Sequence, residues 1–354
     1  MGGASDAFAP PLELSVSMDS VNGVIADYQK RHLLSGTLLL VKAGQEIEWD
    51  IGLADDRKKI KNGRQVVSML ASLSKSFVAA AILRLAEQHQ LSRQDSLHTW
   101  IPEYAHSREI TLEQLLTHTS GIPEAYSVPE LENRIDRTPV DFQDILQAIK
   151  DQPLSFTPGA QFEYSNTGYL FLGEVVHRAS HEPYHQFLQN QFFLPLGLTH
   201  TSVGPPTDAS LVIARSYEPA LVERVDIAEK YGLKNMAAAD VFADTNIYSD
   251  IGDLKTWVTK LTNAEVLSST ATAALLTPHL NDYGYGWFIY HDTQGRLVYE
   301  HSGDYGGYQS WARRYPQTGT LILWLSNQGM ALDQLSAFIE AISRAILPQY
   351  SKSS

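Results

Sequence analysis

Ser72 and Lys75 lie three residues apart at the start of a long apolar segment of the chain. A helix places residues three apart side by side, so the amine of this lysine would reach the serine hydroxyl. A serine is a weak nucleophile until a neighbouring base removes its proton. The flanking residues Leu70, Ala71 and Leu73 predict burial, which favours the neutral, basic form of the lysine. The pair therefore indicates nucleophilic catalysis, although a serine and a lysine at this spacing are also common in ordinary helices.

A second polar group, Tyr164 and Asn166, follows a turn at Thr157-Pro158-Gly159. A tyrosine held near a lysine can shuttle a proton, and an asparagine amide can hydrogen-bond a substrate amide while it fixes the lysine. The structural alternative is that Asn166 caps a helix over 168–179. The two roles are compatible, because a capping residue can also line a site.

A third group, His301 and Gly303, comes at the end of a predicted strand over 296–300. A glycine in a strand lets a substrate lie close along the strand edge. The backbone N–H of the next residue, Asp304, would then be a second hydrogen-bond donor to an oxyanion, beside the N–H of Ser72. The alternative is a histidine at the end of a strand, followed by a turn.

The three groups occur in the order Ser-x-x-Lys, Tyr-x-Asn and His-x-Gly, and this order resembles the serine β-lactamase and penicillin-binding-protein superfamily. The resemblance is closest to its branch of class C β-lactamases, D,D-peptidases and esterases. It extends from about residue 20 to residue 347. Four further segments have counterparts in that superfamily: 115–123, 158–166, 195–198 and 325–327.

The resemblance implies a serine enzyme that transfers acyl groups without a metal or an organic cofactor. In such an enzyme Ser72 would attack a carbonyl carbon while Lys75 and Tyr164 share the proton. Asn166 would orient the substrate amide or Lys75, and His301 would line the site on the strand edge. The acyl-enzyme would then be hydrolysed by water or taken by another nucleophile.

Two residues depart from the pattern of this superfamily. Many of its β-lactamases and D,D-carboxypeptidases have a lysine at the position of His301, and that lysine helps to hold the substrate carboxylate. Because a histidine is often neutral at pH 7, the sequence favours an esterase, an amidase or a D-amino-acid peptidase over a β-lactamase. Asp304 stands where many relatives have glycine or another small residue. If its side chain faces the cleft, it would repel a carboxylate and attract an amine.

Three other activities stay open: a β-lactamase or D,D-carboxypeptidase, an acyltransferase that uses an alcohol or amine, and a sensor that is acylated without turnover. The segment His181-Glu182-Pro183-Tyr184-His185 also matches the H-E-x-x-H string of zinc peptidases. That zinc site requires both histidines on one continuous helix, which Pro183 would interrupt. We therefore expect a small ester, amide or peptide as the substrate, and no metal.

The elements that must position these residues come from both ends of the chain. Apolar runs separated by turn residues predict a hairpin over 38–51 and several strands between 286 and 326. Helical patterns lie before, between and after them, at 20–34, 72–88, 141–150, 168–179, 183–193 and 334–347. We therefore expect a fold of the α/β (α+β) class, with one antiparallel sheet that is built from N- and C-terminal segments and flanked by helices.

This arrangement predicts three parts of the chain. We expect a flexible segment at 1–15, an α/β subdomain made of 16–95 and 281–350, and an inserted, mostly helical subdomain at 96–280. A cleft between two subdomains is the usual place for a site.

The composition excludes several classes of protein. The 354 residues are 44% hydrophobic and 19% charged, which is typical of a globular chain. The net charge of −13 leaves no basic surface for nucleic acid, and no apolar run approaches the ~20 residues of a membrane span. The absence of cysteine excludes disulfides and thiolate ligands. The compartment and the oligomeric state stay open, with a periplasmic or secreted chain favoured over a cytoplasmic one.

Overall fold

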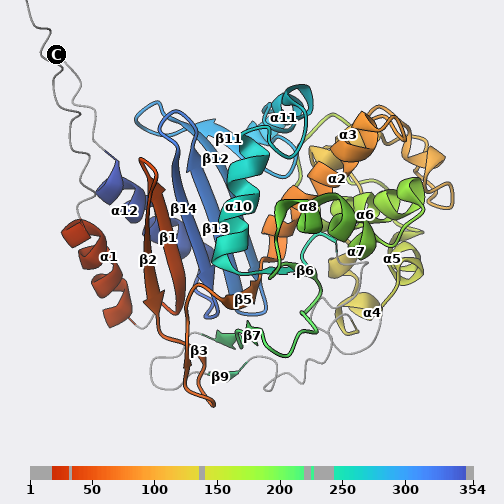
Figure 1. Cartoon of the computed structure of the whole chain (residues 1–354). Coiled ribbons are helices and arrows are strands. Elements are labelled where there is room, and N and C mark those ends of the chain that lie inside the picture. The colour runs from red at the N-terminus through yellow and green to blue at the C-terminus, as the bar shows by residue number, and fades with distance from the viewer. Residues whose placement is uncertain (1–17, 32–33, 135–139, 219–224, 227–242, 348–354) are drawn as a thin grey trace, which may run out of the picture.

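The computed structural model describes residues 18–31, 34–134, 140–218, 225–226 and 243–347, so the expected flexible segment at 1–15 lies outside it. A six-stranded antiparallel sheet forms the framework, in the order β11-β12-β13-β14-β1-β2 (Figure 1). Its strands are β1 (Gly36–Lys42), β2 (Gln45–Ile51), β11 (Phe288–His291), β12 (Leu297–Tyr305), β13 (Tyr308–Tyr315) and β14 (Thr320–Ser326). The N-terminal hairpin therefore joins the C-terminal strands, which confirms the predicted fold class.

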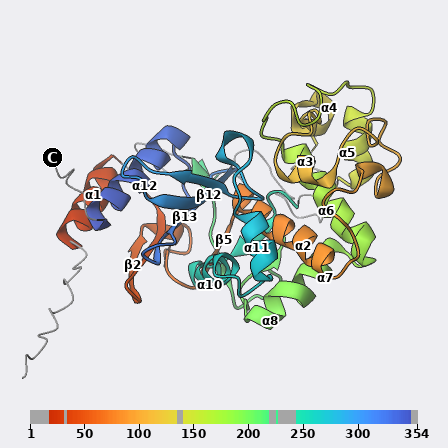
Figure 2. The ribbon, with the colours of Figure 1, turned by 90° about the horizontal axis from the view of Figure 1, so that it is seen from above.

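Alternating side chains give this sheet two apolar faces. On β1, Leu38 and Leu40 belong to the core beneath helices α1 (Met18–Lys30) and α12 (Leu332–Ile346), whereas Leu39 belongs to the core of the opposite face. Figure 2 shows α1 and α12 side by side on their face of the sheet. None of the helices in the described ranges has the length and apolarity that crossing a membrane requires.

The opposite face carries α2 (Lys75–Glu87), which is buried along most of its length. It packs against α6 (Asn166–Ser180) and against α10 (Ile251–Thr262), where the ring of Phe77 stacks on Trp257 at 3.9 Å. The remaining α-helices in the described ranges are α3 (Leu112–Leu116), α4 (Pro129–Glu132), α5 (Phe142–Ile149), α7 (Tyr184–Leu188), α8 (Leu194–Leu196) and α11 (Ser269–Leu275). The division of the chain into two subdomains remains a prediction.

A second sheet, in the order β6-β10-β5-β7, holds the segment that leads to Ser72. Its strands are β5 (Val66–Met69), β6 (Ser202–Val203), β7 (Val212–Ile213) and β10 (Ile247–Ser249). Two short strand pairs lie outside both sheets: β3 (Leu53–Asp55) with β4 (Ile60–Lys61), and β8 (Tyr217–Glu218) with β9 (Val225–Asp226). Strand β5 runs into a 3-10 turn, η1 (Ala71–Ser74), and the α-helix begins only at Lys75, so the single helix predicted from 72 to 88 is wrong at its start. Ala71 has φ of +47°, a left-handed conformation that lets the chain turn from strand into helix within a few residues.

Capping side chains fix where the helices begin. Thr111 forms a capping box with Gln114 at the start of α3. At the start of α6, the hydroxyl oxygen of Ser165 accepts the N–H of Gly168 at 3.0 Å. The expectation that Asn166 is the cap is therefore wrong: Ser165 takes this role, and the side chain of Asn166 reaches Lys75 instead.

Candidate active site

Ser72 and Lys75 contact each other directly, with 3.0 Å between Oγ and Nζ. The lysine is fully buried, and its other two hydrogen bonds go to Oδ1 of Asn166 at 2.9 Å and to the backbone oxygen of Asp244 at 3.3 Å. These three oxygens hold the amine in one position. In its neutral form the amine would donate to two of them and present its lone pair to the hydroxyl of Ser72.

The turn that carries Ser72 is tied to a strand on each side. On one side the N–H of Leu70 donates to the backbone oxygen of Ile247 in β10, and the N–H of Ile247 donates to Oγ of Ser74. On the other side the hydroxyl of Ser310 in β13 donates to the backbone oxygen of Leu70. Both sheets therefore fix the position of the candidate nucleophile, which is what a fast reaction requires of a reacting atom.

The ring of Tyr164 lies against the same lysine, with 5.0 Å between Nζ and the ring centroid. A second ring, that of Tyr169, lies 5.7 Å from Nζ. The face of an aromatic ring attracts a cation, so both rings would stabilise a positive charge that develops on this amine. The structure thus brings together Ser72, Lys75, Tyr164 and Asn166, which are far apart in the sequence.

His118 supports the segment that carries Tyr164. The backbone oxygen of His118 accepts the N–H of Glu163, and its Nδ1 accepts the N–H of Ser165 at 3.1 Å. Its ring centroid lies 4.2 Å from that of Tyr164 and 4.6 Å from that of Tyr283. Burial lowers the pKa of His118 well below its usual range, so the ring is neutral. Because Nδ1 is an acceptor, the proton of the ring is on Nε2.

His301 lies in the same cluster and is almost completely buried. Its Nδ1 donates to the backbone oxygen of Ser302 at 2.7 Å, and the hydroxyl of Tyr283 donates to its Nε2 at 3.1 Å. Burial, assisted by the charge of Lys75, lowers the pKa of His301 to about 3. At neutral pH His301 therefore offers no positive charge to a substrate carboxylate.

Gly303 brings strand β12 against the turn that carries Ser72. A Cβ atom on Gly303 would lie 2.8 Å from the backbone nitrogen of Ser72 and would collide with the backbone oxygen of Leu70. Only a glycine allows the two backbones to approach in this way. The predicted oxyanion donors, the N–H groups of Ser72 and Asp304, thus belong to adjacent segments.

The side chain of Asp304 turns away from Ser72. Successive side chains of a strand point to opposite faces, so Asp304 lies on the face opposite to the Cβ direction of Gly303. There its Oδ2 accepts a hydrogen bond from Nε2 of Gln309 at 3.2 Å, and the same amide donates to the backbone oxygen of Met330. We expect Asp304 to repel a carboxylate only if its side chain faces the site, and the side chain does not. The backbone N–H of Asp304 remains a candidate donor to the oxyanion.

Two carboxylates that no motif indicated lie beside these residues. Oδ2 of Asp244 is 3.7 Å from Nζ of Lys75, and the hydroxyl of Tyr126 donates to its Oδ1 at 2.9 Å. Burial raises the pKa of Asp244 to about 6, although Lys75 acts in the opposite direction. Glu124 accepts the backbone N–H of Asn166 at 2.9 Å. Asp244 is 169 residues from Lys75, and no pattern in the sequence links the two.

A family model described as Beta-lactamase matches residues 21–336. The chain belongs to the Beta-lactamase family. This result confirms the resemblance that the three motifs carried, and serine acyl transfer or hydrolysis is the type of chemistry it supports.

The curated relatives of this family member are distant and longer. It is 28% identical over 316 residues to protein flp of Staphylococcus aureus (strain N315), an alignment that covers 85% of this chain and 61% of the relative. It is 26% identical over 344 residues to penicillin-binding protein 4* of Bacillus subtilis (strain 168), covering 90% of this chain and 74% of the relative. The chain therefore spans about three fifths of the length of protein flp.

Solved structures of similar proteins cover nearly the whole chain. A penicillin binding protein from Bacillus halodurans matches with a TM-score of 0.76 and 26% identity over 91% of this chain and 99% of the other. The D-amino acid amidase from Ochrobactrum anthropi SV3, in complex with D-phenylalanine, matches with a TM-score of 0.80 and 20% identity over 93% and 98%. At 20% identity the second match shows the fold alone.

The H-E-x-x-H string does not form one helix in this member of the Beta-lactamase family. His181 has φ of +59° and ends α6, whereas His185 lies in α7, which begins after Pro183. Two histidines one turn apart on a continuous helix are what the zinc peptidases use, and these two do not have that arrangement.

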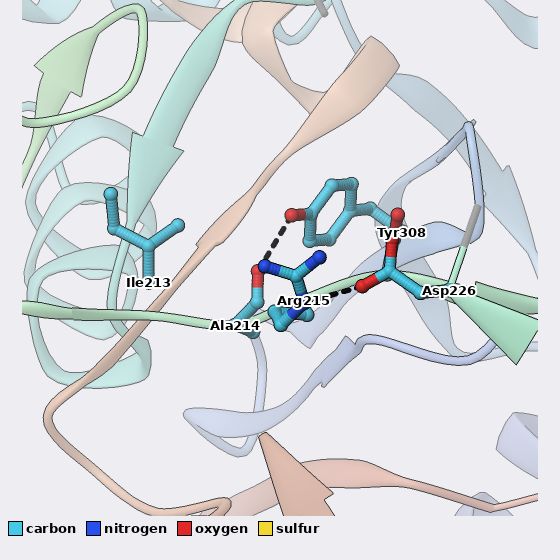
Figure 3. Close-up of a pocket in the computed structure, with 6 residues that line it drawn as sticks. Ile213, Ala214, Arg215, Asp226 and Tyr308 are labelled. Carbon is cyan, nitrogen blue, oxygen red and sulfur yellow. Dashed lines mark hydrogen bonds and ion pairs between the residues drawn. The ribbon is translucent and has the colours of Figure 1, made fainter. Parts of the chain in front are cut away.

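A hollow of about 220 Å³ lies beside β7 and the start of β13 (Figure 3). The hydroxyl of Tyr308 donates to the backbone oxygen of Ala214 at 2.6 Å, and Arg215 forms an ion pair with Asp226. The two charged side chains of the hollow thus neutralise each other. It is lined by none of the residues that the sequence predicted for the site.

Proposed function

We propose that the chain is a serine hydrolase that forms an acyl-enzyme on Ser72 and cleaves an ester or amide bond, as an esterase or a D-amino-acid peptidase or amidase. The observation that carries this proposal is the 3.0 Å contact between Oγ of Ser72 and the fully buried amine of Lys75. A serine that touches a positioned base is the arrangement that nucleophilic catalysis needs.

The proposed reaction has two halves. In the first, Oγ of Ser72 bonds to the carbonyl carbon as its proton moves to Lys75, with Tyr164 sharing it, and the leaving alcohol or amine departs with that proton. The carbonyl oxygen becomes an oxyanion, which the N–H groups of Ser72 and Asp304 would stabilise. In the second half, water attacks the acyl group, and the proton of that water returns through Lys75 to Ser72.

The charges around Ser72 support a substrate without an obligatory carboxylate. The pKa of His301, at about 3, keeps this residue neutral at physiological pH. The amine beside Ser72 is that of Lys75, and the carboxylate of Asp244 already faces it at 3.7 Å. A substrate carboxylate would therefore find little attraction here, which favours esters and amides over penicillins.

The names of structural neighbours point the same way. One is a D-amino acid amidase, and another, from Streptomyces sp., is a D-stereospecific amidohydrolase at 21% identity and a TM-score of 0.70. Because both identities are low, they support the amide side of the proposal as analogies of fold.

The test is a turnover screen with short-chain p-nitrophenyl esters, D-amino-acid amides and a chromogenic cephalosporin. We expect continued product release from esters or D-amides and slower release from the cephalosporin. The Ser72→Ala variant should release no product from any of the three. Preferred turnover of the cephalosporin would instead indicate a β-lactamase.

Two other outcomes would replace the proposal. A single stoichiometric burst without turnover on any substrate would indicate an acylated sensor. Product release that an added alcohol or amine accelerates, with formation of the new ester or amide, would indicate an acyltransferase.

A further inference from the structure

Asp244 places a buried negative charge next to the candidate base. Its Oδ2 lies 3.7 Å from Nζ of Lys75, and the two side chains are 2% and 0% exposed. This distance is too long for a hydrogen bond. The three hydrogen bonds of the amine go instead to Ser72, Asn166 and the backbone oxygen of Asp244. The carboxylate therefore acts on Lys75 through its charge and leaves the contact with Ser72 intact.

This charge matters most at the moment of reaction. When a neutral Lys75 takes the proton of Ser72, it becomes an ammonium ion in a place that is closed to water. A buried ion is costly unless an opposite charge stands beside it. A group that already lies in position, and needs no rearrangement when charge develops, lowers the barrier of the step.

We propose that Asp244 is a positioning residue of the reaction, whose carboxylate stabilises the ammonium ion that forms when Lys75 removes the proton of Ser72. Ser72, Lys75 and Asp244 then act as a serine–lysine–aspartate triad. The O–H bond of Ser72 breaks, an N–H bond forms on Lys75, and the leaving group later takes that proton, while Asp244 stays ionised throughout. This inference rests on the proposed acylation of Ser72.

The surroundings of Asp244 hold its carboxylate in this orientation. The hydroxyl of Tyr126 donates to Oδ1 at 2.9 Å, which leaves Oδ2 toward Lys75. The charged and titratable groups that act on Asp244 are Lys75 from α2 and Tyr126 and Glu124 from the segment before α4. Three residues further along the chain, Ile247 is bonded to both Leu70 and Ser74, so Asp244 and the turn of Ser72 share one anchor.

The triad predicts how the rate depends on pH. The pKa of Asp244 is raised to about 6, because burial outweighs the effects of Lys75 and of the Tyr126 hydrogen bond. Above pH 6 the carboxylate is charged and can stabilise the ammonium ion. As the pH falls through 6 Asp244 takes a proton, and kcat should fall with it.

The test compares hydrolysis of a neutral p-nitrophenyl ester by the parent, Asp244→Asn and Tyr126→Phe between pH 5 and 8. We expect Asp244→Asn to lower kcat roughly 10- to 100-fold with little change in KM, and to lose the fall near pH 6. In Tyr126→Phe the ionised Asp244 loses a donor, so the midpoint of the fall should move to higher pH. A matched control is Asp253→Asn, since Asp253 is bonded to His200 and Thr201 away from the site and should keep the kcat and midpoint of the parent.

Two results would overturn the triad. One is an Asp244→Asn variant with the parent's kcat or the parent's pH midpoint. The other is an unchanged pH midpoint in Tyr126→Phe, which tests the triad even if Asp244→Asn does not fold. If the parent hydrolyses esters and the variants give either of these results, only the triad is disproved. If the parent neither hydrolyses any substrate nor becomes acylated on Ser72, the proposed function is disproved as well.

Discussion

A Cβ atom on Gly303 would stand 2.8 Å from the backbone nitrogen of Ser72. Strand β12 and the turn of the candidate nucleophile therefore approach each other backbone to backbone at Gly303. The two N–H groups proposed as donors to the oxyanion come from these two segments. The distance between the segments depends on residue 303 being a glycine, which has no side chain.

The first prediction concerns Gly303→Ala. The added methyl group meets backbone atoms of Leu70 and Ser72, which cannot move aside as a flexible side chain can. We expect a loss of about 1–3 kcal/mol in the free energy of unfolding, as for other overpacked sites. Ester turnover should fall by about 100-fold or more, because a shift of about 1 Å in a reacting group costs that much. Urea unfolding and steady-state kinetics measure the two effects.

Gly23→Ala is the matched control for this prediction. Gly23 lies within helix α1, and a Cβ there would meet no atom within 4 Å. This variant should gain roughly 0.5–1 kcal/mol from the higher helix propensity of alanine and keep its activity. Equal activity of Gly303→Ala and Gly23→Ala would contradict the role given to the close approach.

The second prediction concerns stability in mild acid. The pKa of His301 is lowered to about 3 and that of His118 well below its usual range, while both would titrate near 6.5 in the unfolded chain. Below pH 6.5 the unfolded state therefore binds protons that the folded state does not, so stability falls as the pH falls. With its pKa at about 3, His301 should cost about 2 kcal/mol between pH 7 and pH 5, and His118 adds a loss of the same sign. Asp244 opposes this trend, since its pKa is raised in the fold.

Urea unfolding at pH 7 and pH 5 measures this effect in the parent and in His301→Gln. The variant lacks one of the two buried rings. Its loss in the free energy of unfolding between pH 7 and pH 5 should therefore be about 2 kcal/mol smaller than that of the parent. His200 is a useful contrast, because Asp250 raises its pKa and its contribution is lost as the pH rises. An identical pH dependence in His301→Gln and the parent would show that His301 is not held neutral.

Local sequence patterns predicted much of this fold. The strands expected between 286 and 326 correspond to β11, β12, β13 and β14, and the helix expected at 141–150 corresponds to α5 within one residue at each end. These elements depend on alternation, apolar periodicity and capping residues, all of which are local. The motifs also identified a set of residues that the structure brings together around Lys75.

The features that the sequence did not predict depend on contacts between distant segments. No local pattern places Asp244 beside Lys75, because the packing of β10 against the turn η1 brings them together. The 3-10 turn that replaces the first turn of the expected helix follows from the left-handed Ala71 between two sheets. A serine and an asparagine are both good capping residues, so the choice of Ser165 over Asn166 was decided by what each side chain could reach.

The third prediction follows from the orientation of Asp304. Its carboxylate accepts a hydrogen bond from Gln309 on the face of the sheet away from Ser72. An exposed charge in that position is screened by solvent and acts weakly on a substrate in the site. We therefore expect Asp304→Asn to change the ratio of cleavage rates for matched esters with amine and carboxylate tails by no more than about twofold. A tenfold change would show that the side chain reaches the substrate.

The last prediction separates stability from function at Asp244. Removal of one partner of a buried ion pair usually destabilises a protein. Here the opposite is expected, because the raised pKa of Asp244 means that burial of its charge costs more than the attraction of Lys75 returns. Asp244→Asn should therefore increase the free energy of unfolding at pH 7.5 by on the order of 1–3 kcal/mol. The gain should fade as the pH falls below 6, where the parent residue becomes neutral as well.

Asp292→Asn is the control of opposite sign. Burial alone would raise the pKa of Asp292, but hydrogen bonds from the backbone N–H groups of Arg296 and Gln294 and from the Arg296 side chain lower it, so loss of its charge should destabilise the fold at pH 7.5. If Asp244→Asn is also destabilised, the attraction of Lys75 outweighs desolvation and the residue has a structural role. If Asp244→Asn is more stable and less active than the parent, the charge of Asp244 destabilises the fold and supports the reaction. That result is expected of a residue that acts in catalysis.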